Sequence, residues 1–176
     1  MKIKYKKISK EAFIPVKANK SDSGWDVRAT ERSYLQPHSI TKVPIGLAFE
    51  IPEGYEIQIR GKSGLALEYG FSIAQGIGTI DSGYRGEVCI ILKNLKPYLR
   101  VIEIGDMVAQ LVIQKVEEVE FEEVDELEDS ERGKDGFGKS TEKMIKEEKE
   151  VKNGNPKVAN EDRKETPGTT KQGINS

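Results

Sequence analysis

Glycine stands beside hydroxyls, charges or carboxylates in five short segments of the sequence, which hold most of the side chains suited to chemistry. The segments cover residues 21–26, 60–66, 76–86, 105–111 and 132–140. Residues 60–66 combine cations, the Ser63 hydroxyl and unobstructed backbone amides, which is how a site for phosphate oxygens is built. Residues 76–86 have the pattern of a glycine-rich hairpin with one acid, Asp81, and one aromatic, Tyr84. Taken singly, Asp26, Asp81 and Asp106 are each more typical of turn caps, so only the combination of the segments indicates a site.

Residues 133–140 also satisfy the phosphate-loop pattern G-x-x-x-x-G-K-[ST]. That pattern binds phosphate when a buried strand enters the loop and a helix leaves it, within alternating β and α units. Here an acidic, hydrophilic stretch precedes the loop and a charged tail follows it. We therefore do not interpret the segment as a phosphate loop; standing alone, it would be a flexible glycine-rich linker.

The composition excludes several classes of function. The 28 Lys and Arg residues against 30 Asp and Glu give a net charge of −2, which supplies no positive field for a nucleic-acid backbone. One cysteine, Cys89, and one histidine, His38, exclude a disulfide framework, a cysteine zinc site and a multi-histidine metal centre. No apolar run approaches the roughly 20 residues that span a bilayer, and the first residues do not resemble a signal peptide. We expect a cytoplasmic protein without a nucleic-acid or membrane partner.

Short strands must position the five segments. Strand patterns cover residues 41–51, 55–60, 88–92 and 107–113, followed by Val119 and Phe121 between glutamates. Turns rich in Gly, Pro and Asp separate these strands, which predicts a compact all-β barrel or sandwich. Only residues 63–69 indicate a short helix.

The composition changes near Glu122. The chain becomes acidic and thinly apolar there, and after Thr141 it has no periodic apolar face, so burial cannot offset the entropy of ordering it. We predict a β-barrel core over residues 1–124, a mobile arm over 125–141 and a mostly disordered tail over 142–176. A brief helix over 144–151 would be marginal alone.

Together and in this order, the five segments resemble the five motifs of the deoxyuridine triphosphatase (dUTPase) family. The most specific are Ser23-Gly-Trp-Asp26, Gly78-Thr-Ile-Asp-Ser-Gly-Tyr-Arg-Gly86 and Arg132-Gly-x-x-Gly-Phe-Gly138. The resemblance runs from about residue 21 to residue 141. It implies a compact, jelly-roll-like β fold with a mobile arm, and a homotrimer whose subunits share their active sites.

The resemblance also implies an activity: hydrolysis of magnesium-bound dUTP to dUMP and pyrophosphate, which limits uracil in DNA and supplies dUMP for dTTP synthesis. Asp81 matches the catalytic acid that activates a water for attack on the α-phosphorus. Tyr84 matches the aromatic under the deoxyribose, which leaves no space for a 2′-hydroxyl. The hairpin that reads the uracil edge corresponds to Gln75, Gly78, Thr79 and Ile80.

Other matched residues contact the phosphates. Ser63 and Gly64 match the second motif, and Gln110 matches an amide of the fourth. Lys62 stands where the family usually has arginine, so it keeps the charge but loses the planar fork. Met107 also stands at a usual arginine position and carries no charge, so a cation such as Arg28 or Arg60 must compensate or affinity falls. Asp26 matches an acid near the water shell of Mg²⁺.

The fifth motif gives residues 132–140 the role of a lid. Arg132 matches a contact to the γ-phosphate, and Phe137 matches the ring that stacks on uracil. Ser140 would add a phosphate contact. Gly138 and the neighbouring glycines let the arm close over the ligand and exclude water.

Two other functions stay open. The related dCTP deaminases share the fold but need a glutamate at the position of Ile91, which cannot transfer protons, and they lack the arm. A weakly catalytic, nucleotide-binding regulatory protein is the second alternative, because Lys62 and Met107 depart from the family pattern.

Overall fold

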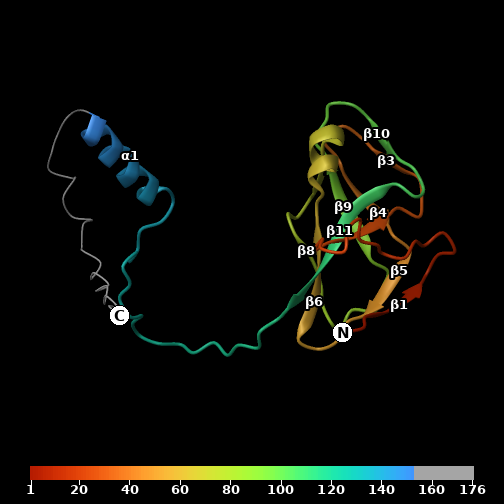
Figure 1. The fold of residues 1–176 in the computed structure, drawn as a ribbon, viewed down its shortest axis with the longest axis horizontal. Coiled ribbons are helices and arrows are strands. Elements are labelled where there is room, and N and C mark those ends of the chain that lie inside the picture. The colour runs from red at the N-terminus through yellow and green to blue at the C-terminus, as the bar shows by residue number, and fades with distance from the viewer. Residues whose placement is uncertain (153–176) are drawn as a thin grey trace, which may run out of the picture. The chain divides into compact units, whose positions relative to one another are not determined.

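The computed structural model describes residues 1–152 of the chain and divides them into two units, Met1–Glu120 and a second that begins at Phe121. The first unit holds β1 (Lys4–Lys7), β2 (Trp25–Arg28), β3 (Ser33–Leu35), β4 (Ile40–Pro44), β5 (Leu47–Glu50), β6 (Tyr55–Arg60), the short π-helix η1 (Leu65–Tyr69), β7 (Phe71–Ile73), β8 (Gly78–Ile80), β9 (Cys89–Asn94), β10 (Arg100–Ile102) and β11 (Met107–Lys115). All paired strands are antiparallel (Figure 1). The all-β prediction and the short helix within residues 63–69 are confirmed.

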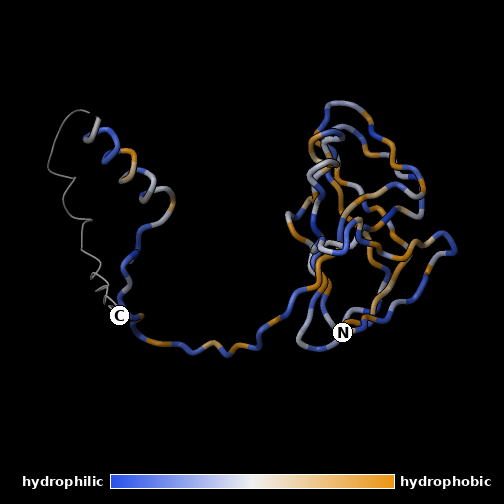
Figure 2. The backbone as a smooth tube through the Cα atoms, in the orientation of Figure 1, coloured by the Kyte–Doolittle hydropathy of each residue, from blue (hydrophilic) through white to orange (hydrophobic). Residues whose placement is uncertain are grey.

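Four sheets build the first unit, with strand orders β2-β11-β6-β8, β4-β9-β7, β1-β5 and β10-β3. Alternation in the sequence becomes burial in these sheets: Ile57 and Ile59 of β6 are 1% and 5% exposed, whereas Gln58 between them is half-buried. Apolar segments gather along the strands (Figure 2). β8 forms the edge of the four-stranded sheet, where Ile57 pairs with Ile80 and Ile59 with Gly78. The packing of β6 therefore fixes the base of the hairpin that carries Asp81.

The strand predicted over residues 41–51 is divided, because the chain bends between β4 and β5 at Gly46. Gly46 has φ of +66°, and an added Cβ would lie 2.9 to 3.0 Å from Thr30, Ala12 and Ser9. Its N–H donates to the Glu87 carboxylate at 3.1 Å, and its carbonyl accepts from the Ile8 N–H at 2.8 Å. Left-handed backbone and close packing together require glycine here, and simple alternation does not reveal such a bend.

The strand predicted at Val119 and Phe121 does not form. These side chains are 68% and 95% exposed, and residues 116–124 belong to no strand. A strand needs a partner edge for its backbone hydrogen bonds, and alternation alone does not supply one.

The second unit contains the helix α1 (Lys139–Lys152). It covers residues 142–152, for which the sequence predicts mostly disorder with at most a marginal helix. Met144 and Ile145 of this helix are 62% and 46% exposed, so these two apolar side chains remain largely in solvent. The remainder of the predicted tail, residues 153–176, lies outside the described residues. Within the described chain, no helix is long and apolar enough to cross a bilayer.

Candidate nucleotide site

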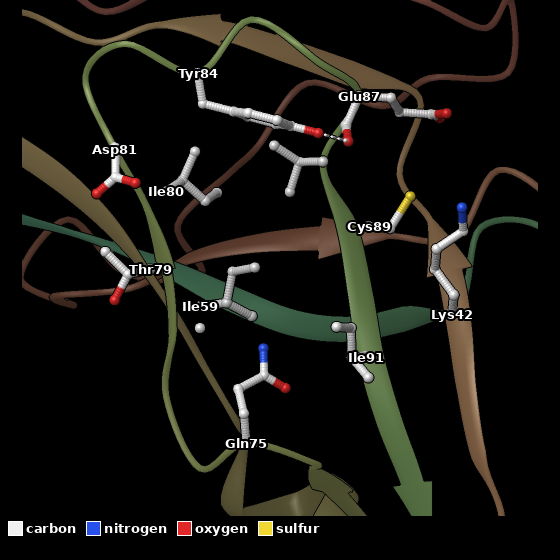
Figure 3. A pocket seen from close by; sticks show the side chains of 12 residues that line it. Lys42, Ile59, Gln75, Thr79, Ile80, Asp81, Tyr84, Glu87, Cys89 and Ile91 are labelled. Atoms are coloured by element: carbon white, nitrogen blue, oxygen red, sulfur yellow. Dashed lines mark hydrogen bonds between the residues drawn. The ribbon is translucent and has the colours of Figure 1, made fainter.

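The hairpin after β7 and the neighbouring strand β9 enclose a pocket of about 330 Å³, here called the hairpin pocket. Its lining residues are Lys42, Ile59, Gln75, Gly78, Thr79, Ile80, Asp81, Tyr84, Glu87, Val88, Cys89 and Ile91. In Figure 3 Tyr84 lies across one end and Gln75 at the other, with isoleucine side chains between them. The structure therefore brings together Asp81, Tyr84 and the hairpin residues that the sequence assigns to the uracil edge. Phe137, which the sequence assigns to stacking on the base, belongs to the second unit.

Asp81 follows directly after β8, at the start of a tight turn. Its backbone carbonyl accepts a hydrogen bond from the Tyr84 N–H at 3.1 Å, so the turn sets the spacing of the two residues. The carboxylate is exposed, and no ion pair engages it among the described residues. It is accessible to both solvent and ligand.

The Tyr84 ring is held in place by its hydroxyl, which donates to the Glu87 carbonyl at 3.1 Å (Figure 3). A Cβ on Gly86 would lie 2.3 Å from the Tyr84 oxygen, so the ring packs against bare backbone. The Glu87 carboxylate in turn accepts the Gly46 N–H. Sequence reasoning found Tyr84 but missed Glu87, whose partner is 41 residues away.

Cys89 and Lys42 also line the pocket and were not predicted there. Burial raises the pKa of the Cys89 thiol above its ordinary value, and the Glu87 carboxylate adds to the shift. The sulfur is therefore a protonated, poorly nucleophilic wall of the pocket at neutral pH. Alternation in β9 is the signal that would have placed Cys89 and Ile91 on one face with Lys93.

A second pocket of about 390 Å³, here called the cation pocket, lies beside the start of η1. Lys62 and Gly64 of the second motif line it together with Arg28, Met107 and other residues of β7, β10 and the turn before β11. The Lys62 ammonium forms an ion pair with the carboxylate of Asp26, a residue that is 8% exposed. The first and second motifs therefore meet here.

Gln110 of β11 pairs with Arg60 and Asp26 in the strand register. Its side-chain N–H donates to the Gly61 carbonyl at 2.9 Å, which ties the fourth motif to the second. Ser63 sits between Lys62 and Gly64, shortly before η1. The polar groups predicted to contact phosphate in the first unit thus cluster around one turn.

The hairpin pocket and the cation pocket have no lining residue in common. The remaining predicted residues belong to the second unit. There Arg132 Nε donates to the Asp135 carbonyl at 3.0 Å, while Phe137 is fully exposed with φ of +51° and Gly138 has φ of +92°. The side chain of Ser140 lies outside the described part of the chain.

A metal ion at these sites would depend on oxygen donors. Among residues 1–152, no group of three or more His, Cys, Asp or Glu side chains is placed to hold an ion. Mg²⁺ commonly keeps several waters and takes further oxygens from substrate phosphates, so one or two carboxylates suffice. The Asp26 carboxylate fits that requirement in donor chemistry, with Lys62 as its present partner.

The chain is an antiparallel β-protein with a pocket between a hairpin and a neighbouring strand. A sequence model of the dUTPase family matches residues 10–141. The deoxyuridine 5′-triphosphate nucleotidohydrolase of Helicobacter pylori strain P12 is 41% identical over 138 residues, covering 78% of this chain and 95% of that protein. The enzyme of the same name from Nautilia profundicola is 44% identical, covering 78% and 97%. The chain belongs to the dUTPase family.

Solved structures agree with this assignment. The dUTPase of Staphylococcus bacteriophage 80alpha with dUpNHpp has a TM-score of 0.73 and 30% identity, covering 78% of this chain and 96% of that one. A mutant dUTPase of the S. aureus phage phi11, described with a structural Mg(II) ion, has a TM-score of 0.67 and 26% identity, covering 72% and 98%.

Proposed function

We propose that this protein hydrolyses dUTP to dUMP and pyrophosphate. Family membership supports the activity, and the observation that carries it is the hairpin pocket, where Asp81 and Tyr84 lie three residues apart on one turn. The reaction would limit uracil in DNA and supply dUMP for dTTP synthesis.

Asp81 is the proposed catalytic residue. Its exposed carboxylate would orient a water and take its proton as the water attacks the α-phosphorus in line with the leaving pyrophosphate. Positioning matters most in this chemistry, and the hydrogen bond from Tyr84 N–H to the Asp81 carbonyl supports a fixed turn.

Tyr84 and the hairpin are the proposed determinants of specificity. A ring anchored through its hydroxyl cannot move aside for a 2′-hydroxyl without losing the hydrogen bond to Glu87. Main-chain groups of residues 75–80, together with Gln75, would read the uracil edge. The isoleucine walls of the pocket favour a planar, weakly polar base.

The proposed phosphate contacts come from Lys62, Ser63, Gly64 and Gln110, which cluster around the turn before η1. Asp26 would contact Mg²⁺ indirectly, through the waters of the ion. When bound to the triphosphate, the ion neutralises negative charge on the phosphate oxygens. Arg132, Phe137, Gly138 and Ser140 would close over the ligand as a lid.

We further propose a homotrimer with shared active sites. One nucleotide must contact both a base-and-sugar pocket and a phosphate-binding turn. In this chain the two pockets have no lining residue in common, and the lid residues belong to the second unit. Bringing residues from different subunits together would complete the site.

The direct test is pyrophosphate release from dUTP, dTTP, dCTP, dATP, dGTP and UTP in the presence of Mg²⁺. We expect release from dUTP alone, and loss of turnover but retention of binding in Asp81→Asn. Glu53→Gln is the matched control. Glu53 and Asp81 line a separate surface pocket, so this substitution removes a neighbouring carboxylate and leaves Asp81 in place. Full activity of Asp81→Asn would refute the mechanism.

The deaminase alternative is disfavoured by Ile91, whose apolar side chain lines the hairpin pocket where a proton-transferring acid would be required. Ammonia release from dCTP would restore it. The regulatory alternative is supported by the ion pair that occupies Lys62, by the uncharged Met107, and by the phage 80alpha relative, which is described as controlling the transfer of virulence genes. Tight binding of dUpNHpp with negligible turnover of dUTP would favour it.

A further inference from the structure

The cation pocket contains two positively charged side chains, and they differ in what they already contact. Lys62 is paired with the Asp26 carboxylate. Arg28 forms no ion pair with any described residue. Its hydrogen bond runs from Nη1 to the Gly105 carbonyl at 2.6 Å, which uses one of the five N–H donors of a guanidinium. Arg28 therefore keeps both its charge and most of its donors available.

The position of Arg28 is set by the strands. It stands opposite Met107 in the register of β2 and β11, and the register shifts between Met107 and Ala109. Such a bulge redirects side chains at the end of a strand. Both residues line the cation pocket together with Gly64, so the guanidinium and the phosphate-binding turn border the same space.

Two acids also line this pocket, and neither neutralises Arg28. The Asp106 carboxylate accepts the Glu103 N–H at 2.9 Å and thereby caps a turn. Glu68 belongs to η1 and forms no ion pair within the described residues. Met107 offers no charge that would repel or replace the guanidinium.

The other arginine near the site is engaged elsewhere. Arg60 donates to the Gln58 side-chain oxygen from Nε at 3.0 Å and from Nη2 at 2.6 Å. It does not line the cation pocket. The structure therefore distinguishes between the two cations that flank the phosphate-binding turn.

We propose that Arg28 binds the β- and γ-phosphates of the nucleotide and supplies the positive charge that Met107 does not. This inference rests on the proposed function, since it takes a nucleoside triphosphate as the ligand. A guanidinium with free N–H donors suits phosphate oxygens because it forms two parallel charge-assisted hydrogen bonds. Arg28 is thus a further binding residue of the site, and it is Arg28 rather than Arg60 that takes the place of the missing charge at Met107.

The test compares a triphosphate with a monophosphate by calorimetric titration of the full chain with dUpNHpp and dUMP, each with Mg²⁺. Removing one charge-assisted hydrogen bond costs about 10- to 100-fold in affinity. We expect Arg28→Met to weaken dUpNHpp binding by about this factor while dUMP binding changes less than about twofold. Arg60→Met is the control, and it also tests the rival hypothesis that Arg60 supplies the missing charge. We expect this variant to bind both ligands as the wild type does.

The variant Arg28→Met combined with Met107→Arg tests whether charge at this place is what matters. Restored dUpNHpp affinity in the double variant supports the proposal. Wild-type affinity in Arg28→Met overturns it, as does equal weakening for dUMP, which would indicate a structural role. Loss in Arg60→Met but not in Arg28→Met would assign the role to Arg60. If the wild-type protein neither binds nor cleaves dUTP, the proposed function itself fails; an active wild type with an unaffected Arg28→Met refutes this inference alone.

Discussion

Lys62 and Asp26, 36 residues apart in the chain, form an ion pair in which the side chains are 26% and 10% exposed. The pair joins the turn before η1 to the middle of β2. It also means that the Lys62 ammonium already has a partner before any phosphate arrives. A ligand phosphate must therefore share this cation with the Asp26 carboxylate.

Lys62→Met should destabilise the fold, because it leaves the Asp26 carboxylate mostly buried without its cation. We expect the free energy of unfolding, measured in urea, to fall by about 1 to 3 kcal/mol, between the values for exposed and buried pairs. Lys4→Met, which removes the exposed pair with Glu50, is the control and should change little. Equal stability of the two variants would show that the Lys62–Asp26 pair contributes nothing.

Gly86→Ala should relax the exclusion of ribonucleotides. The new Cβ would lie 2.3 Å from the Tyr84 oxygen, so the ring must move away from the position in which its hydroxyl donates to the Glu87 carbonyl. We expect the ratio of kcat/KM for dUTP over UTP to fall by about tenfold or more, a loss of about 1.4 kcal/mol of discrimination. Gly83→Ala is the matched control, since no atom lies within 4 Å of its added Cβ. A preserved ratio in Gly86→Ala would remove Tyr84 from the selectivity mechanism.

Cys89 should react slowly with iodoacetamide, and more slowly still with dUpNHpp bound, because it lines the hairpin pocket and its thiol pKa is raised by burial. The raised pKa of Cys89 also makes the stability of the fold depend on pH. Folding favours the protonated thiol, so its contribution to the free energy of unfolding is complete below the ordinary thiol pKa and is lost as pH rises above it. Mass spectrometry of the alkylated chain measures the first effect. Unfolding of Cys89→Ser and wild type from pH 7 to pH 10 measures the second, and parallel pH curves would contradict it.

Removal of residues 132–176 should abolish most turnover, whereas removal of residues 142–176 should leave it close to the wild-type value. The first deletion takes away Arg132 and Phe137, the proposed lid contacts. The second retains them but removes all of α1 except its first three residues. Steady-state pyrophosphate release from dUTP compares the two. Activity restricted to the full-length chain would give α1 or the residues after it a part in the reaction.

The part of the hairpin pocket formed by residues 75–84 was predictable from the sequence because these residues are close together in the chain. Asp81 and Tyr84 lie on one turn, and the base of that turn is set by alternation in β6 and β8. Glu87 was not predictable, because its role depends on a hydrogen bond to Gly46, whose bend also divides the strand expected over residues 41–51. Local patterns do not encode such distant contacts.

In the carboxyl-terminal segment, sequence patterns do not predict the secondary structure reliably. Val119 and Phe121 alternate like a strand, yet they belong to no strand of the described chain. α1 includes the brief helix that the sequence allowed over residues 144–151, although Met144 and Ile145 stay exposed in it. The sequence likewise assigns Lys62 and Asp26 to the site but does not predict the ion pair between them.

The hairpin pocket and the cation pocket share no lining residue, so a substitution in the lining of one pocket leaves the residues of the other unchanged. This separation has a genetic consequence. In a trimer that joins the hairpin pocket of one subunit to the cation pocket of its neighbour, two differently crippled alleles would complement each other. Co-expressed Asp81→Asn and Arg28→Met chains would form mixed assemblies in which some sites are wholly wild-type, whereas either allele expressed by itself would contain none.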